Sequence, residues 1–248
     1  MFCNYAFYFG AEKNNTTEIK KMEKEVGCCG IKVFVGVSTG TLIVSDYKDI
    51  KRIMKSTKKM ISFHSEDQYE LNKREKFIKR GDPKSHPKWR NESVCLICTK
   101  NLVKLANQTK KKIHILHITT AEEIELLNKN KKYVSYEVTP QHLVLSSPSC
   151  YDKLGTLAQM NPPIRSLRHN KRLRQALKNN EIDIVGSDHA PHKLSEKKLE
   201  YPDSPSGMPG VQTLLPILLN EVSKKMISIN NVVELTSYNP INRFKVKN

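Results

Sequence analysis

Short runs of apolar residues along this chain end repeatedly in polar residues. The clearest runs cover residues 60–67, 113–120 and 183–192. Apolar runs of this length predict short buried strands. A plausible helix follows each of the first two runs. After the second, Thr120 is a candidate N-cap with Glu123 three residues later, which is the spacing of a capping box. The pattern therefore predicts an α/β chain in which strands alternate with helices.

Each run carries a side chain suited to metal chemistry at its polar end. These side chains are His64, His117 and Asp188. In barrels of parallel strands, the loops after the strands build the active-site face. Imidazole nitrogens and a carboxylate gathered there would suit zinc or a similar divalent ion. A capped turn with solvated histidines is the less favoured alternative for residues 183–192. A single strand-end histidine is more often a structural residue than a ligand.

A lysine interrupts another apolar run, at residues 30–41. Lys32 lies inside this predicted strand, where a buried amine is costly unless it is paired, neutralised or chemically changed. Carbon dioxide could add to the amine, and the resulting carbamate would be an anionic metal ligand. Alternatively, Lys32 extends its charged end to water from an edge strand, which the spacing alone favours.

Six segments in the same order and spacing resemble dihydroorotases of the amidohydrolase superfamily. They are residues 30–41, 64–67, 117–123, 137–143, 160–165 and 187–192. The resemblance runs over nearly the whole chain. It implies one partial barrel domain over residues 1–248, of the (β/α)8 TIM barrel type and lacking the first strands. It also implies interconversion of N-carbamoyl-aspartate and dihydroorotate in pyrimidine synthesis, with one or two zinc ions.

The resemblance also implies roles for individual residues. Lys32 would be a carboxylated lysine that bridges two metal ions, and His64 and His117 would bind the second ion. Asp188 would bind the first ion and act as the catalytic base, returning a proton to the leaving nitrogen. The residues implied in substrate binding are Asn161, His192, Ser206 and Gly207.

Several departures from the family pattern bear on these expectations. The His-x-His-x-x-Arg segment that usually ends the first barrel strand is absent from the sequence, and Gln141 replaces a common histidine. Two strand and helix units would then be missing at the start, and the small β domain that usually follows the barrel would be missing at the end. A barrel without two strands has exposed edges, which predicts a homo-oligomer or a complementing subunit. The alternatives are a hydantoinase-like or allantoinase-like hydrolase, and a catalytically inactive remnant or partner subunit.

The composition of the chain gives expectations about partners, membrane association and cellular compartment. The formal net charge is +17 over 248 residues, but the lysines are dispersed and no nucleic-acid partner is expected. No apolar run is long enough for a membrane span, and the start does not read as a signal peptide. Six irregularly spaced cysteines favour a reduced, cytoplasmic compartment. Cys95 and Cys98 form a C-x-x-C pair in apolar surroundings, which predicts a core helix rather than half of a zinc site.

Overall fold

Six parallel strands form the centre of the molecule in the computed structural model, which describes residues 5–38 and 42–246. The strands are β1 (Phe7–Gly10), β2 (Cys28–Phe34), β3 (Ile61–His64), β4 (Ile113–Ile115), β5 (Val134–Val138) and β6 (Ile184–Val185). Their order in the sheet is their order in the chain. Each strand therefore lies beside the strand that precedes it, as in an arc cut from a parallel barrel.

Helices connect and follow the strands. The α-helices are α1 (Thr16–Lys21), α2 (Tyr47–Ser56), α3 (Gln68–Arg74), α4 (His86–Trp89), α5 (Glu92–Thr109), α6 (Ala121–Asn128), α7 (Pro140–Val144), α8 (Ser149–Leu154), α9 (Leu167–Lys178), α10 (Leu194–Lys197), α11 (Val211–Ser223), α12 (Ile229–Val233) and α13 (Asn239–Phe244). Short 3-10 helices are η1 (Met22–Lys24), η2 (Glu75–Phe77), η3 (Pro83–Ser85) and η4 (Gly155–Ala158), and η5 (Glu234–Tyr238) is a π-helix.

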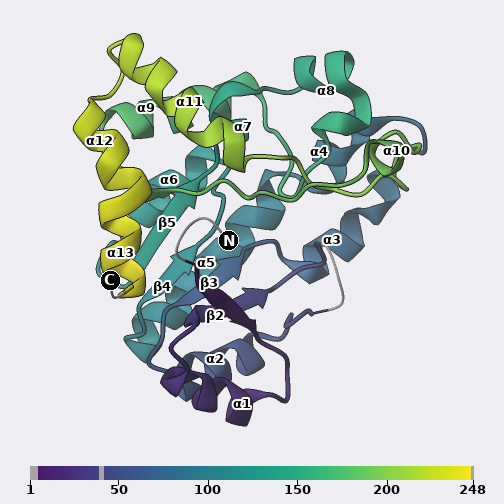
Figure 1. Ribbon diagram of the computed structural model, residues 1–248. Coiled ribbons are helices and arrows are strands. Elements are labelled where there is room, and N and C mark those ends of the chain that lie inside the picture. The colour runs from purple at the N-terminus through teal and green to yellow at the C-terminus, as the bar shows by residue number, and fades with distance from the viewer. Residues whose placement is uncertain (1–4, 39–41, 247–248) are drawn as a thin grey trace.

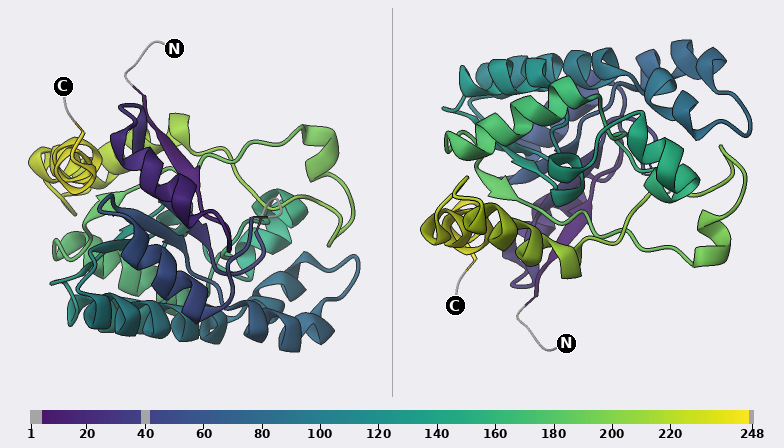
Figure 2. Two further views of the ribbon diagram at one scale, coloured as in Figure 1. Left: turned by 90° about the horizontal axis from the view of Figure 1, so that it is seen from below. Right: turned by 90° about the horizontal axis from the view of Figure 1, so that it is seen from above.

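Five of the helices form one layer against the sheet. Contacts run from α1 to α2, then to α5, α6 and α9, so that neighbours in this row cover successive strands. Figure 2 shows the row from two sides. The short helices α4, α8 and α10 gather instead at one end of the sheet (Figure 1). This end receives the segments that follow the strands, which is where the sequence predicts the chemistry.

The two faces of the sheet differ in polarity. On the helix-covered face lie Ile31, Ile61 and Ile113, which are register partners on adjacent strands and belong to the main core. The neighbouring register row begins with Lys32 and Ser62 and continues with His114 and Ser135. Successive side chains of a strand point to opposite faces, so this polar row lies on the face away from the helices. The predicted strands are therefore apolar on one face only.

The sheet is open within the described residues. Strand β1 pairs only with β2, and β6 pairs only with β5. Edge strand β1 is aromatic, and Phe7 is 60% exposed. The expectation of uncovered strand edges is met in the part of the chain that the structure describes. Across this same part, none of the helices combines the length and the apolar character needed to cross a membrane.

Local predictions can be compared with the observed elements. Helix α6 begins with the expected capping box of Thr120 and Glu123. Cys95 and Cys98 are free and buried in α5, which confirms the core-helix interpretation. The run at residues 113–120 is a shorter strand than expected, because β4 ends at Ile115. Residues 39–41 of the run that contains Lys32 lie outside the described residues.

Candidate metal and substrate site

A small cavity opens where strands β2, β3, β4 and β6 end. Its volume is about 130 Å³, and its lining residues are Lys32, Phe34, Ser38, His64, His117, Asn161, Asp188, Ala190, Ser206 and Gly207. Seven of the eight residues that the sequence suggests for this site are among them. The eighth, His192, lies directly beside the cavity, where its Nε2 donates a hydrogen bond to the backbone oxygen of Ser206 at 3.2 Å. The structure therefore brings all eight predicted residues to one place.

Two histidines face each other in this cavity. His64 Nδ1 and His117 Nε2 are 3.0 Å apart, and both side chains are buried. Nitrogen ligands lie about 2.0–2.1 Å from a zinc ion, so two of them in a tetrahedral site are roughly 3.3 Å apart. The observed separation is close to that value. The same two atoms could also share one hydrogen bond.

Hydrogen bonding of the histidine pair is incomplete. His64 Nε2 lies 2.9 Å from Glu66 Oε2, whereas His117 Nδ1 is buried with no partner in the described residues. If His117 Nε2 donates to His64, then Nδ1 is an unpaired acceptor. If Nδ1 carries the proton instead, two lone pairs face each other across 3.0 Å. A cation between the two nitrogens would resolve the second arrangement, so this pair fits a metal ion.

The other predicted metal ligands are Lys32 and Asp188, which line the cavity with the histidines. No group of three or more His, Cys, Asp or Glu side chains converges at metal-binding distance among residues 5–38 and 42–246. Asp188 shares the cavity with the histidines but does not complete such a group with them. A third ligand beside the histidine pair could come from another kind of side chain, and Lys32 lines the same cavity.

Lys32 and Asp188 influence each other's ionisation. Burial lowers the pKa of the Lys32 amine to about 8, although the charges of Asp188 and Glu137 act in the opposite direction. Burial raises the pKa of the Asp188 carboxyl to about 6, which the Lys32 charge partly offsets. The Lys32 amine also lies 4.5 Å from the centre of the Phe34 ring. Both groups can therefore exchange protons near neutral pH, as acid and base catalysts must.

The backbone is unusual at two of the predicted ligands. His117 has φ 38° and Asp188 has φ 43°, in the left-handed region that residues other than glycine seldom adopt. The other non-glycine residues with positive φ among those described are exposed lysines and one exposed asparagine: Lys110, Asn180, Lys225 and Lys245. Unfavourable backbone angles in buried strand ends are typical of functional sites. They turn the chain sharply just after β4 and β6.

Asn161 and Gly207 line the same cavity as the histidines. His86 Nε2 lies 3.0 Å from both Asn161 Oδ1 and the Met160 backbone oxygen, so this buried imidazole orients the amide. Gly207 has φ 150°, and a Cβ there would lie 2.5 Å from the Ala190 backbone oxygen. The Gly207 N–H donates to the Gln159 backbone oxygen at 2.9 Å. Of its two backbone groups, the carbonyl is thus the one left to contact a substrate.

A buried lysine holds the loop that carries Ser206 and Gly207. Lys197 Nζ donates to the backbone oxygens of Gln159 at 2.9 Å and Pro205 at 2.8 Å. The Gln159 amide donates in turn to the Ser204 backbone oxygen at 2.7 Å and to Ser206 Oγ at 3.2 Å. Burial lowers the pKa of Lys197 to about 8. We call residues 193–209 the substrate loop.

Sequence reasoning missed the groups that hold the histidines. Glu66 accepts hydrogen bonds from His64 and from Arg90, and the contact with Arg90 Nη1 is 2.5 Å long. Arg165 donates to the Arg90 backbone oxygen and to Thr119 Oγ1. Glu66 could have been found by its position two residues after His64. The arginines carried no such signal.

Gln141, which departs from the family pattern, has a structural contact. Its amide donates to the Ser187 backbone oxygen at 3.1 Å. This bond joins the segment after β5 to the segment that carries Asp188. Gln141 itself is not among the residues that line the cavity.

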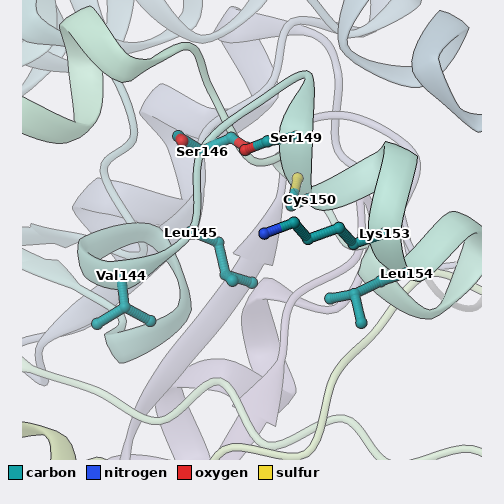
Figure 3. A pocket seen from close by; sticks show the side chains of 7 residues that line it. All are labelled: Val144, Leu145, Ser146, Ser149, Cys150, Lys153 and Leu154. Carbon is teal, nitrogen blue, oxygen red and sulfur yellow. The ribbon is translucent and has the colours of Figure 1, made fainter.

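A second cavity of about 250 Å³ lies beside α8. It is lined by Val144, Leu145, Ser146, Ser149, Cys150, Lys153 and Leu154. Figure 3 shows the Lys153 side chain reaching across it toward Leu145. Burial raises the pKa of the Cys150 thiol to about 11, so the thiol is protonated and unreactive at neutral pH. This cavity is larger, but it carries none of the predicted site residues.

Comparisons with known proteins show what the chain resembles in sequence and in fold. No family model matches the chain. The dihydroorotase of Methanosarcina acetivorans is 31% identical over 253 residues, which cover 95% of this chain and 54% of that protein. The chain thus spans about half the length of this curated relative.

Solved structures share the fold. The L-hydantoinase of Arthrobacter aurescens superimposes with a TM-score of 0.91 at 24% identity, over 98% of this chain and 56% of that one. A dihydroorotase from Saccharomyces cerevisiae, solved in complex with 5-fluoroorotic acid, gives a TM-score of 0.76 at 21% identity, over 98% and 68%. These likenesses confirm the predicted amidohydrolase type of TIM barrel, of which this chain shows six strands in an open sheet.

Proposed function

Because the chain belongs to the dihydroorotase family of amidohydrolases, we propose that its cavity interconverts dihydroorotate and N-carbamoyl-aspartate, a step of pyrimidine synthesis. The observation that carries this proposal is the meeting of Lys32, His64, His117 and Asp188 in one cavity with Asn161 on its wall. Members of this family depend on a metal ion. For this chain we propose zinc, as one or two ions.

The facing nitrogens of His64 and His117 would hold one ion. Lys32 would add an oxygen ligand after carbon dioxide adds to its amine, which requires the neutral form that its lowered pKa makes accessible. Asp188, which lines the same cavity but does not converge with the histidine pair, would bind the other ion from the segment after β6. A divalent ion bound there polarises the amide carbonyl and lowers the pKa of water to near neutral.

Asp188 would also move the proton. Ring opening adds water across the amide: oxygen bonds to the carbonyl carbon, the C–N bond breaks and the nitrogen takes up a proton. With a pKa of about 6, the Asp188 carboxylate can accept a proton from water near neutral pH and return it to the leaving nitrogen. Its left-handed backbone turn directs the side chain into the cavity.

Asn161, the Gly207 carbonyl and Ser206 would hold the ring of the substrate. A cyclic imide presents N–H donors and carbonyl acceptors, which an amide side chain and a backbone oxygen can both match. The His192 imidazole would bind the substrate carboxylate. Its present bond to the Ser206 backbone oxygen would then have to open or be shared.

Completion of the site by other residues is part of the proposal. The chain covers about half of its curated relative, and the open edges of β1 and β6 are places where further strands could pair. We propose that a second copy of this chain or a complementing subunit supplies strands that pair with these edges. A cytoplasmic location is proposed on the composition of the chain.

The test is a substrate panel with purified, folded protein and added zinc. Dihydroorotate, hydantoin and allantoin are supplied separately, beside an Asp188→Asn control. Ring opening of dihydroorotate alone, lost in the control, supports the proposal. Turnover of hydantoin or allantoin instead would assign a different cyclic amide, and no turnover by folded, zinc-loaded protein would favour an inactive or partner-dependent chain.

A further inference from the structure

We infer that Glu66, held in place by Arg90, is a positioning residue that keeps His64 in the tautomer whose Nδ1 lone pair faces His117. The inference deepens the proposed metal site and rests on it for its biological purpose. It concerns a contact between protein side chains, so it can be tested in the metal-free chain.

The contact is specific in its geometry. Glu66 Oε2 lies 2.9 Å from His64 Nε2 and 2.5 Å from Arg90 Nη1. All three side chains are almost fully buried, with exposed fractions of 0% for Glu66 and 2% for the other two. An ionised carboxylate can only accept hydrogen bonds. A proton on His64 Nε2 is therefore stabilised, and Nδ1 is left with its lone pair.

Arg90 makes Glu66 a fixed acceptor. The guanidinium donates from Nη2 to the Val37 backbone oxygen at 2.6 Å and lies 4.5 Å from the centre of the Trp89 ring. These contacts hold the fork of Arg90 in one orientation. Glu66 cannot swing away from His64 without breaking a buried, charge-assisted bond, which costs more than an ordinary hydrogen bond.

A second arginine, Arg165, links Arg90 to the segment after the other histidine. Arg165 donates to the Arg90 backbone oxygen and, through Nε, to Thr119 Oγ1 at 3.0 Å. Thr119 lies two residues after His117. Hydrogen bonds thus connect the segment that carries His64 to the segment that carries His117. They restrain the distance between the two imidazoles as well as the tautomer of His64. Outer partners of this kind orient metal-binding histidines in many proteins.

The decisive variant removes the acceptor without leaving a buried charge. Glu66→Met combined with Arg90→Met replaces the ion pair by apolar side chains, which proteins often tolerate. Glu66→Gln is the conservative partner, because its amide oxygen can still accept from Nε2. Glu70→Met is the matched control, since Glu70 lies on α3 and pairs with exposed Lys73.

Two readouts do not depend on turnover. Nitrogen-15 NMR of metal-free protein, with His64 assigned by a His64→Asn spectrum, reports which ring nitrogen carries the proton. We expect Nε2 in the wild type, in Glu66→Gln and in the control, and a mixture in the double variant. Zinc affinity, measured by competition with a chelator, is expected to fall about 10- to 100-fold in the double variant.

The outcomes separate this inference from the proposed function. Wild-type protein protonated at Nδ1 overturns it, whether or not the variants fold. An unchanged tautomer and zinc affinity in a folded double variant also overturn it. A chain that opens no cyclic amide but shows the expected tautomers and zinc affinities refutes the proposed function and leaves the role of Glu66 standing.

Discussion

The two sides of the cavity are built by different means. On the histidine side, the ends of β3 and β4 are held by a buried ion pair between Glu66 and Arg90 and by the link from Arg165. On the other side, the substrate loop contains only the four-residue helix α10. It is held by hydrogen bonds from Lys197 and Gln159 to backbone oxygens.

This difference indicates which part of the site has a fixed geometry before a metal ion or substrate binds. Charged groups buried together resist rearrangement, because separating them leaves an unpaired charge in a poorly solvated place. Neutral acceptors with a single buried ammonium are easier to exchange for water or ligand. We therefore expect the histidine side to keep its geometry and the substrate loop to adjust, as segments that close over ligands do.

The largest expected effect comes from breaking the ion pair on one side only. Arg90→Met leaves Glu66 buried without its cation, and we expect the free energy of unfolding to fall by about 3–5 kcal/mol. Urea denaturation of metal-free protein measures it. A loss below about 1 kcal/mol would mean that the histidine side is not rigidly held. The Glu66→Met and Arg90→Met double variant should recover much of the loss.

Lys32→Met is expected to stabilise metal-free protein at pH 7 by about 1–3 kcal/mol. The folded pKa of about 8 is below the ordinary value of 10.5, so wild-type folding carries the full cost of burying the protonated amine at any pH below about 8. The variant removes that cost. It also removes the favourable charge interaction between the Lys32 ammonium and Asp188, which reduces the gain in stability.

The pH dependence of this effect has a definite sign. Above pH 8 the folded wild type loses its proton before the unfolded chain does, so its stability rises with pH up to about 10.5. The advantage of Lys32→Met should shrink over the same range. Denaturation in carbon dioxide-free buffer at pH 7 and pH 10 checks this. A variant less stable than wild type at pH 7 would contradict the account.

Lys197→Met tests the substrate loop. Loss of two buried hydrogen bonds from the ammonium is expected to cost about 1–3 kcal/mol of stability. Amide hydrogen exchange should accelerate at residues 204–207 and stay unchanged at the ends of β3 and β4. In active protein, KM for dihydroorotate should rise more than kcat falls.

Its matched control is Lys198→Met, because Lys198 is the exposed neighbour in the same segment. Equal acceleration of exchange on both sides of the cavity would show that the two sides are not independent. A change in Lys198→Met of the same size would assign the effect to surface charge.

The smallest expected effect concerns the surface ion pairs between Arg80 and the substrate loop. Arg80 pairs with Glu200 and Asp203, and all three side chains are more than half exposed. Exposed ion pairs contribute about 0–1 kcal/mol, so Arg80→Ala should change stability by no more than that. A larger loss in urea denaturation would mean that surface charges, rather than Lys197, hold the loop.

The sequence predicts the parts of this molecule that depend on local pattern. Apolar runs that end in His64, His117 and Asp188 marked three strand ends, and Thr120 with Glu123 marked the start of α6 correctly. The barrel type followed from six segments in family order. The meeting of the eight site residues was predicted from that resemblance: seven of them line the cavity, and His192 contacts Ser206 beside it.

Other features could not be predicted because they depend on distant partners. Arg90 lies 24 residues from Glu66 and 75 from Arg165, and nothing in its neighbourhood of the sequence marks it as buried. Strand β4 ends at Ile115, and His117 two residues later adopts a left-handed backbone that periodicity does not reveal. The use of the Gly207 N–H by Gln159 depends on two loops meeting in space.

The most direct test of the central claim is the position of a bound metal ion. Crystals of the chain are soaked in zinc, and the ion is located by anomalous diffraction at the zinc edge. The account predicts a peak about 2.0–2.1 Å from both His64 Nδ1 and His117 Nε2, on the cavity side toward Lys32. A saturated crystal with its zinc elsewhere, or with the two nitrogens still sharing a hydrogen bond and no ion between them, would contradict it.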